Sequence, residues 1–179
     1  MYCPVCKTSP LTAIEPEPNL RTLQCSNCEG HWLQSYHYWT WLSDRDSEIV
    51  PEWNSEPEEL QPRDTAEAKI CIECGKLMSR FRVGKGMEFY LDRCGYCAGI
   101  WFDRHEWETL KSRKIHDVIH KIFARPWQRE IVQIDYDNRL KETIGPDKFQ
   151  NLKSLKSWLD HDPNRGLILG YLEKLEPDG

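Results

Sequence analysis

Several features that would assign this chain to a common class are missing from its 179 residues. No apolar run approaches the roughly 20 residues that a membrane-spanning helix needs. No signal peptide is visible, because Cys3 and Cys6 follow the initiator Met almost at once. There is also no Ser/His/Asp set, no glycine-rich phosphate loop and no convincing pair of carboxylates. We therefore expect a cytoplasmic protein without membrane contact and without enzymatic activity.

Apolar side chains and positive charge are both in short supply. Apolar residues make up 39% of the chain, the mean hydropathy is −0.70, and the formal net charge is −5. The core is therefore limited, and the eight tryptophans are expected to supply much of its buried area. An acidic chain argues against tight nonspecific binding of nucleic acid, but it leaves room for a local basic face.

No cysteine stands outside a Cys-x-x-Cys pair. In a reduced compartment, pairs of this kind indicate metal binding rather than a disulfide framework. Unliganded buried thiols are disfavoured by the complete pairing. Thiol–disulfide exchange is disfavoured too, because redox enzymes usually carry one such pair at a helix N-terminus in a βαβ context. The eight cysteines are Cys3, Cys6, Cys25, Cys28, Cys71, Cys74, Cys94 and Cys97.

The pairs belong to an internal repeat. Cys3 and Cys25 are 22 positions apart, and Cys71 and Cys94 are 23 positions apart. In both copies a glycine follows the last cysteine by two positions and a tryptophan follows it by four. Two Cys-x-x-Cys turns on neighbouring strands complete a closed tetrahedral shell, which zinc favours. We therefore predict two structural zinc ions, the first on Cys3, Cys6, Cys25 and Cys28 and the second on Cys71, Cys74, Cys94 and Cys97. Iron in a rubredoxin-like site is the less favoured rival with the same ligands.

The stretch from Cys94 to Glu106 carries a family resemblance. Its pattern, Cys-x-x-Cys-x-Gly-x-Trp-Phe-Asp-Arg-x-Glu, resembles the zinc ribbons of the TFIIB type. The resemblance covers about 3–42 and 71–110, and it implies small ribbon folds without transferring a role in transcription. The first copy departs from the pattern at three positions. Gln34 and His37 stand where the second copy has Asp103 and Glu106, and Lys7 stands where it has Gly75.

The predicted fold class is small α+β zinc-ribbon modules, two in tandem, with an all-α C-terminal extension. The two ribbons are expected to pack against each other as a pseudo-two-fold pair. The linker is assigned by its nine acids against three bases and its three prolines. The predicted divisions are 1–43 for the first ribbon, 44–69 for the acidic linker, 70–110 for the second ribbon, and 111–179 for a helical region with an αα-hairpin.

Local patterns predict the elements inside these divisions. A strand over 20–23 leads to Cys25, and strands over 77–83 and 87–91 flank a Gly84–Gly86 turn. Ser35 is expected to cap a short helix. Asp103 and Glu106 have the spacing of a capping box, which opens a helix to about Phe123. Helix starts are expected at Pro126, Pro146 and Pro163. The apolar stripes of the αα-hairpin comprise Phe149, Leu152, Leu155, Trp158 and Leu159, then Leu167, Ile168, Tyr171, Leu172 and Leu175.

Three further groups are candidates for binding. Positive side chains interleave with aromatic ones on the second ribbon, a pattern used to grip single-stranded nucleic acid, although an ordinary charged hairpin face is the simpler interpretation. His116 and His120 have a metal-binding spacing without a third ligand, which favours a solvated helix face. His31 could replace a thiolate at the first metal site, but four cysteines are already available there. The basic candidates are Arg80, Arg82, Lys85 and Arg93.

The sequence favours a zinc-binding interaction protein, an adaptor or assembly factor that contacts protein partners. The expected contact surfaces are the αα-hairpin and a set of aromatic side chains that we expect to be exposed. One alternative is a nucleic-acid-binding accessory factor of transcription or translation. A second is a redox-responsive switch, in which oxidation of a thiolate pair releases zinc. The aromatic set is Tyr36, Tyr38, Trp39 and Trp41.

Overall fold

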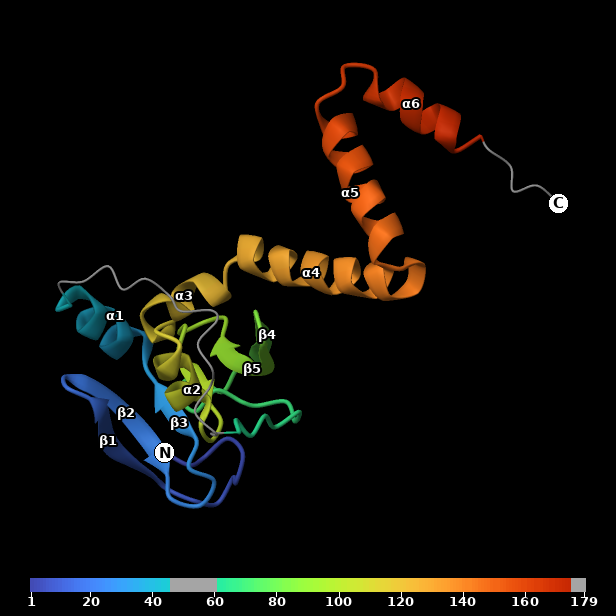
Figure 1. The fold of residues 1–179 in the computed structure, drawn as a ribbon. Helices are drawn as coiled ribbons and strands as arrows, with labels where there is room; N and C mark the ends of the chain where they lie inside the picture. Colours follow the sequence, from blue (N-terminus) through green and yellow to red (C-terminus); the bar gives the residue numbers. More distant parts are fainter. Residues whose placement is uncertain (46–60, 175–179) are drawn as a thin grey trace. The chain divides into compact units, whose positions relative to one another are not determined.

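The computed structural model describes residues 1–45 and 61–174, and it divides into two compact units, Met1–Ile131 and Val132–Gly179. Figure 1 shows the elements in chain order. They are β1 (Leu11–Glu17), β2 (Leu20–Cys25), β3 (His31–Leu33), α1 (Ser35–Ser43), β4 (Met78–Gly84), β5 (Met87–Cys94), β6 (Ile100–Phe102), α2 (Glu106–Ser112), the 3₁₀ turn η1 (His116–Val118), α3 (Ile119–Ile122), α4 (Arg125–Ile144), α5 (Pro146–Asp160) and α6 (Arg165–Leu172). No helix in the part of the chain so described has the length and apolarity needed to cross a bilayer.

One antiparallel sheet joins the two ribbons. Its strand order is β1-β2-β3-β6-β5-β4, so each ribbon contributes a hairpin and a short inner strand. The inner strands β3 and β6 pair at the centre, with Trp32 directly opposite Trp101. From either edge, the sheet begins with a ribbon's hairpin and continues with the short inner strand of the same ribbon. This symmetric order confirms the predicted pseudo-two-fold pairing of the ribbons.

The sheet separates two groups of buried side chains, because successive residues of a strand point to opposite faces. On one face, Leu33 and Phe102 meet the apolar sides of α1, α2 and α3. On the other face, Trp32 and Trp101 pack among the cysteines. The core of the first unit is therefore built partly from ordinary apolar packing and partly around the cysteine clusters.

The predicted strands are confirmed. Strand β2 ends at Cys25, and β4 and β5 flank the glycine turn. Helix α1 begins at Ser35, but the serine does not cap it; Gln34 is the N-cap residue and no side chain bonds the helix end.

The prediction of one helix from Asp103 to about Phe123 is wrong. Helix α2 ends at Ser112, Lys114 adopts a left-handed φ of 53°, and the chain restarts as η1 and α3. The break lets Ile115 turn back into the core, where its backbone N–H donates to the carbonyl of Leu110 at 2.9 Å. Burial of this isoleucine and of the α3 side chains outweighs the bonds of a continuous helix.

The capping box forms only in part. The backbone N–H of Asp103 donates to Glu106 Oε2 at 2.8 Å, as predicted. The Asp103 carboxylate instead accepts from Trp101 Nε1 at 2.7 Å and from the backbone N–H of Thr65 at 2.7 Å. The aspartate therefore ties the ribbon to the preceding segment rather than capping α2.

Part of the predicted linker lies against the second ribbon; residues 46–60 lie outside the described residues. The backbone N–H of Arg63 donates to the carbonyl of Arg104 at 3.0 Å. Lys69 is buried, with 1% of its surface exposed. The segment that leads into Cys71 is therefore part of the ribbon's own packing.

The second unit is helical, as predicted. Gly145, at a φ of 86°, precedes Pro146 at the start of α5. Asp162 Oδ1 accepts from the backbone N–H of Asn164 at 2.7 Å just before α6. Helix α6 buries none of its residues, and the predicted stripe residue Leu175 lies outside the described residues. Across 132–174, Leu159 is the one buried side chain, so these helices form without a core of their own.

Candidate metal centres

Each predicted set of four cysteines is brought together. Within each set, the sulfur atoms lie within 4.8 Å of one another. The Sγ–Sγ distances are 3.5 Å for Cys3–Cys28 and 3.3 Å for Cys74–Cys94. A tetrahedral zinc with Zn–S bonds of about 2.3 Å separates its sulfurs by about 3.8 Å, whereas a disulfide holds them about 2.05 Å apart. All eight cysteines are free of disulfides. The donor set and its spacing fit two Cys₄ zinc ions.

The first turn of each site has the same backbone form. The carbonyl of Cys3 accepts from the N–H of Lys7 at 2.8 Å, and that of Cys71 accepts from Gly75 at 3.0 Å. Lys7 and Gly75 have φ values of 65° and 66°. At the position where the second ribbon has Gly75, the first ribbon thus has a lysine in a left-handed backbone conformation. Glycine alone adopts this conformation without strain.

The second turn repeats this arrangement. The carbonyls of Cys25 and Cys94 accept from the N–H groups of Glu29 and Ala98, at 2.9 and 3.0 Å. Glu29 and Ala98 have φ values of 60° and 59°. Each loop thus holds its pair of sulfurs by backbone hydrogen bonds rather than by particular side chains, which explains why the repeat keeps its spacing while its other residues vary.

The backbone also sets the charge of one thiol in each site. Burial raises the pKa of Cys25, but the N–H groups of Cys28 and Asn27 outweigh it and lower the value to about 7. The same balance at Cys94, with the N–H groups of Cys97 and Tyr96, also gives a pKa of about 7. Burial raises the pKa values of Cys28, Cys71 and Cys97, and it raises that of Cys3 to about 11. One sulfur per site is therefore ready to bind a cation near neutral pH, and these four thiols lose their protons as metal binds.

The glycine and tryptophan of the repeat pack across the two ribbons. A Cβ on Gly30 would lie 2.3 Å from Trp101 Cζ2, and a Cβ on Gly99 would lie 2.3 Å from Trp32 Cζ2. Each ribbon's glycine therefore makes room for the other ribbon's indole. This reciprocal contact joins the metal centres through their own repeat motif.

The structure adds a buried ion network that sequence reasoning missed. Lys69 Nζ lies 2.6 Å from Asp92 Oδ2 and 3.3 Å from Asp103 Oδ2, and it also donates to the carbonyl of Thr65 at 3.0 Å. Burial opposes the charge of the lysine, but the two carboxylates outweigh it and raise its pKa. Lys69 is the cation of an acidic cluster that includes Asp103 and Glu106. No sequence period marks these positions, because they lie on three separate segments.

The four basic candidates all lie on the β4–β5 hairpin, where each has a partner. Arg80 pairs with Asp64 at 2.5 Å, and Arg82 pairs with Glu88 at 2.7 Å. Lys85 pairs with Glu130 at 3.1 Å and lies over the Trp127 ring, and Arg93 lies over the Phe123 ring. The hairpin thus brings the predicted residues together, but their charge is largely balanced within the protein.

The predicted solvated position of His116 is wrong. The ring is buried between Trp41 and Trp107, at 5.7 Å from both ring centroids. Its Nε2 lies 3.2 Å from Asp117 and 3.5 Å from Glu17. The helix break after Ser112 explains the error, because it turns the 116–122 segment toward the core.

Two other predictions concern aromatic and imidazole side chains. His31 is buried and bonds Gln24 at 2.8 Å, so it stands apart from the cysteine cluster. Tyr38 and Trp41 are buried, so their predicted exposure is wrong; Tyr38 donates to the carbonyl of Asp117 at 2.8 Å. Tyr36 and Trp39 are exposed, as expected for a contact surface. The helix period of α1 sorts the four aromatics onto two faces.

These features define a pair of four-cysteine zinc ribbons joined through a shared sheet. Residues 68–113 match the family model of the TFIIB-type zinc ribbon, described as a transcription factor zinc-finger. The second ribbon is therefore a zinc ribbon of this type, and the first has the same cysteine geometry outside the matched range. No curated protein and no solved structure matches the chain.

Proposed function

We propose that the chain is a non-enzymatic, zinc-stabilised adaptor or assembly factor, which binds another protein through an apolar face of its C-terminal helices. The observation that carries this proposal is the lack of a core in 132–174, where large apolar side chains remain uncovered. Uncovered apolar surface beyond a few hundred Å² marks interaction sites in soluble proteins. The exposed side chains are Val132, Ile134, Tyr136, Leu152, Leu155, Trp158, Leu167, Leu169, Tyr171 and Leu172.

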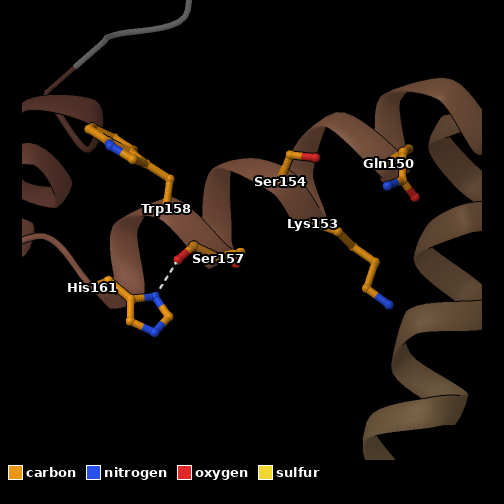
Figure 2. Close-up of a pocket in the computed structure, with 6 residues that line it drawn as sticks. All are labelled: Gln150, Lys153, Ser154, Ser157, Trp158 and His161. Atoms are coloured by element: carbon orange, nitrogen blue, oxygen red, sulfur yellow. Dashed lines mark hydrogen bonds between the residues drawn. The ribbon is translucent and has the colours of Figure 1, made fainter.

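Leu155 and Trp158 are the centre of the proposed contact. They lie three positions apart on α5, so they share one side of the helix. Figure 2 shows the Trp158 indole projecting from α5 on a different side from Lys153, and 53% of its surface is exposed. Tryptophan is enriched among the residues that contribute most to protein–protein binding, because its large ring fills a pocket on the partner.

The metal centres suit a structural role. Each zinc would have four cysteine ligands, which leaves no position for a substrate or an activated water. Binding of zinc to such sites contributes about 10–16 kcal/mol to folding. The ribbons would thus form a stable base from which the helices and the exposed Tyr36 and Trp39 of α1 contact a partner.

The redox-switch alternative has one observation in its favour. Paired sulfurs such as those of Cys71 and Cys97 lie only 3.5 Å apart. Hydrogen peroxide would take two electrons from two thiolates, form the S–S bond, become two hydroxide ions and release zinc. Zinc release by mild peroxide, with recovery after a thiol reductant, is the expected result for a switch; zinc retained under peroxide contradicts it.

Native affinity purification tests the proposed function. The full chain is compared with a Leu155→Glu/Trp158→Glu variant and with a matched control, Tyr2→Glu/Leu77→Glu, which also removes two exposed apolar side chains. We expect two zinc ions per chain in all three proteins. A stoichiometric protein partner should be recovered with the full chain and the control, and lost with the α5 variant.

Two outcomes contradict the proposed function. One is the recovery of no protein partner by any of the three chains. The other is stoichiometric RNA or DNA whose binding weakens steeply with salt, which supports the nucleic-acid alternative instead.

A further inference from the structure

A groove between α4 and α5 is uncovered in the second unit. It has a volume of about 610 Å³ and lies within Gln133–His161. Its apolar lining comes from Tyr136 and Leu140 of α4 and from Phe149 and Leu152 of α5. Asp137 and Lys153 face each other across it, with Nζ and Oδ2 4.0 Å apart. A groove with an apolar lining and a charged edge is the kind of surface that receives an amphipathic helix.

Helix α6 has the matching shape and lacks a partner surface among the described residues. Leu167, Ile168, Tyr171 and Leu172 follow a helical period, so they form one apolar stripe. Leu167 is 77% exposed and Tyr171 is 69% exposed. The helix contains one charged residue, Arg165, at its first position. A stripe of this kind is unstable in water unless it is covered.

We propose that α6 of one copy occupies the α4–α5 groove of a second copy, and that the exchange is reciprocal in a two-fold symmetric dimer. Such an exchange places three helices of each chain in one bundle and covers both uncovered surfaces at once. The proposed adaptor face at Leu155 and Trp158 does not line the groove. The inference therefore goes beyond the proposed function, whose central contact at Leu155 and Trp158 would remain exposed in the dimer.

Charge favours a second copy over other occupants. The unit Val132–Gly179 carries nine acids and seven bases, so its net charge is only −2. A nucleic acid or an anionic membrane selects a basic face, and a strongly charged partner selects the opposite sign. Two copies with so small a net charge repel each other only weakly, and no partner of a particular charge is favoured.

The area also suits a dimer. Fully buried aromatic side chains contribute about 150–250 Å² each, and aliphatic ones less. Of the four groove residues and four α6 residues, Tyr136, Leu167 and Tyr171 are more than half exposed and the other five are less exposed, so together they give at most roughly 700 Å² per copy. The total is then at most roughly 1,400 Å² of apolar area for the pair, which is close to a standard stable interface.

The test measures the mass of the full, zinc-loaded chain by light scattering at about 50 µM, above the micromolar dissociation constants found at the weak end for interfaces of this size. The expected mass is twice the chain mass of 21.2 kDa. Leu167→Glu/Leu172→Glu and Tyr136→Glu/Leu152→Glu should each give the monomer mass, with the dimer dissociation constant raised at least 100-fold. Tyr36→Glu/Leu77→Glu, with its two charges placed elsewhere, should remain a dimer. Two zinc ions per chain serve as the folding check.

Mixing the two monomeric variants tests the exchange itself. A mixed pair retains one intact α6 and one intact groove on opposite chains, so dimer should partly reappear in the mixture and in neither variant alone. Recovery supports the reciprocal exchange, and its absence overturns it.

The outcomes separate this inference from the proposed function. A monomeric full chain overturns the inference, whether α6 folds back on its own α5 or stays uncovered. If that monomer still captures a protein through Trp158, the proposed function stands. A dimer that captures no other protein supports the inference and contradicts the adaptor role. A dimer that persists in both helix variants overturns the inference.

Discussion

The two ribbons share their metal geometry and differ almost everywhere else. Both have the same backbone turns, and each has a glycine that receives the other's tryptophan. Around this shared part, the second ribbon has a buried lysine network, whereas the equivalent of Lys69 in the first ribbon is the exposed Met1. The fold therefore depends on the Cys-x-x-Cys turns and on the Gly–Trp contact, while the residues around each ribbon are free to differ.

The hairpin ends show the same contrast. At the end of the first hairpin, Glu17 lies in an ion cluster, 3.3 Å from Arg45 and 3.5 Å from His116. At the end of the second, Gly84 lies against Ile131, and the Val83 carbonyl accepts from Trp127 at 3.0 Å. The first end is held by a buried charge cluster, whereas the second combines apolar packing with a hydrogen bond and the Lys85–Glu130 ion pair, so pH and point substitutions should affect the two ribbons differently.

Loss of a thiolate pair should have the largest effect. Cys25→Ser/Cys28→Ser and Cys94→Ser/Cys97→Ser each remove two ligands from a site that contributes about 10 kcal/mol or more to folding. We expect fewer than two zinc ions per chain and loss of cooperative thermal unfolding in both variants. Metal analysis and circular dichroism measure this. Retention of two zinc ions by either variant contradicts the ligand assignment.

Removal of the buried lysine should come next. Lys69→Met leaves Asp92 and Asp103 without their cation, and breaking a buried pair from one side costs about 3–5 kcal/mol. We expect this loss in the free energy of unfolding, measured with urea. Lys148→Met, at an exposed position, is the control and should change stability by less than about 0.5 kcal/mol. Equal stability of the two variants would mean that the second ribbon gains nothing from its network.

Alanine at the paired glycines tests whether the ribbons are equivalent. Gly30→Ala and Gly99→Ala each push a methyl group into an indole ring, and overpacking of this kind costs about 1–3 kcal/mol. Gly95→Ala meets nothing within 4 Å and is the control. Similar losses in the two variants, measured by thermal unfolding, support a symmetric contact. Tolerance of one variant alone would show that a single tryptophan holds the ribbons together.

The charged hairpin end should make stability depend on pH. Burial, with Arg45 and Lys111 nearby, lowers the pKa of His116 to about 4, although Glu17 and Asp117 lie close enough to oppose the shift. The unfolded histidine titrates near 6.5, so the unfolded state binds more protons between pH 6.5 and pH 4. Stability should therefore fall as pH falls through this window, by on the order of 2 kcal/mol.

His116→Gln isolates that contribution. Acid also protonates the thiols, so the informative quantity is the difference between wild type and variant in urea midpoint, compared at pH 7 and pH 4.5. We expect the wild type to lose more stability than the variant. Equal pH dependence of the two proteins would exclude His116 as the source.

The smallest expected effect concerns the turn where the ribbons differ by one residue. Lys7 has a left-handed φ of 65°, a backbone conformation that costs a residue with a Cβ about 1–2 kcal/mol. Replacing Lys7 with glycine removes this strain, but the greater conformational freedom of glycine in the unfolded chain offsets part of the stability gained. Lys7→Gly should therefore stabilise the first ribbon by up to about 1 kcal/mol, and Gly75→Lys should destabilise the second by a similar amount. The midpoint of thermal unfolding measures both. A lower midpoint for Lys7→Gly, or a higher one for Gly75→Lys, would show that the strain lies elsewhere.

Local repetition in the sequence was enough to predict the metal sites and much of the sheet. The cysteine spacing predicts both clusters, and the Gly84–Gly86 turn predicts the β4–β5 hairpin. The sequence could not place Lys69 among its carboxylates or bury His116, because those contacts join distant segments and follow no period. The helix after Asp103 was predicted too long for the same reason. The apolar pattern of 115–122 is compatible with one helix, and only the tertiary position of Ile115 breaks it.

The central pairing of β3 with β6 has a consequence for synthesis on the ribosome. The first ribbon emerges with Cys25 and Cys28 in place, but the open edge of β3 and the Trp32 indole lack their cover until Gly99 and β6 have followed. An unpaired strand edge invites pairing with other chains. The nascent chain therefore passes through an interval of exposure that ends only when β6 of the second ribbon, up to Phe102, has emerged.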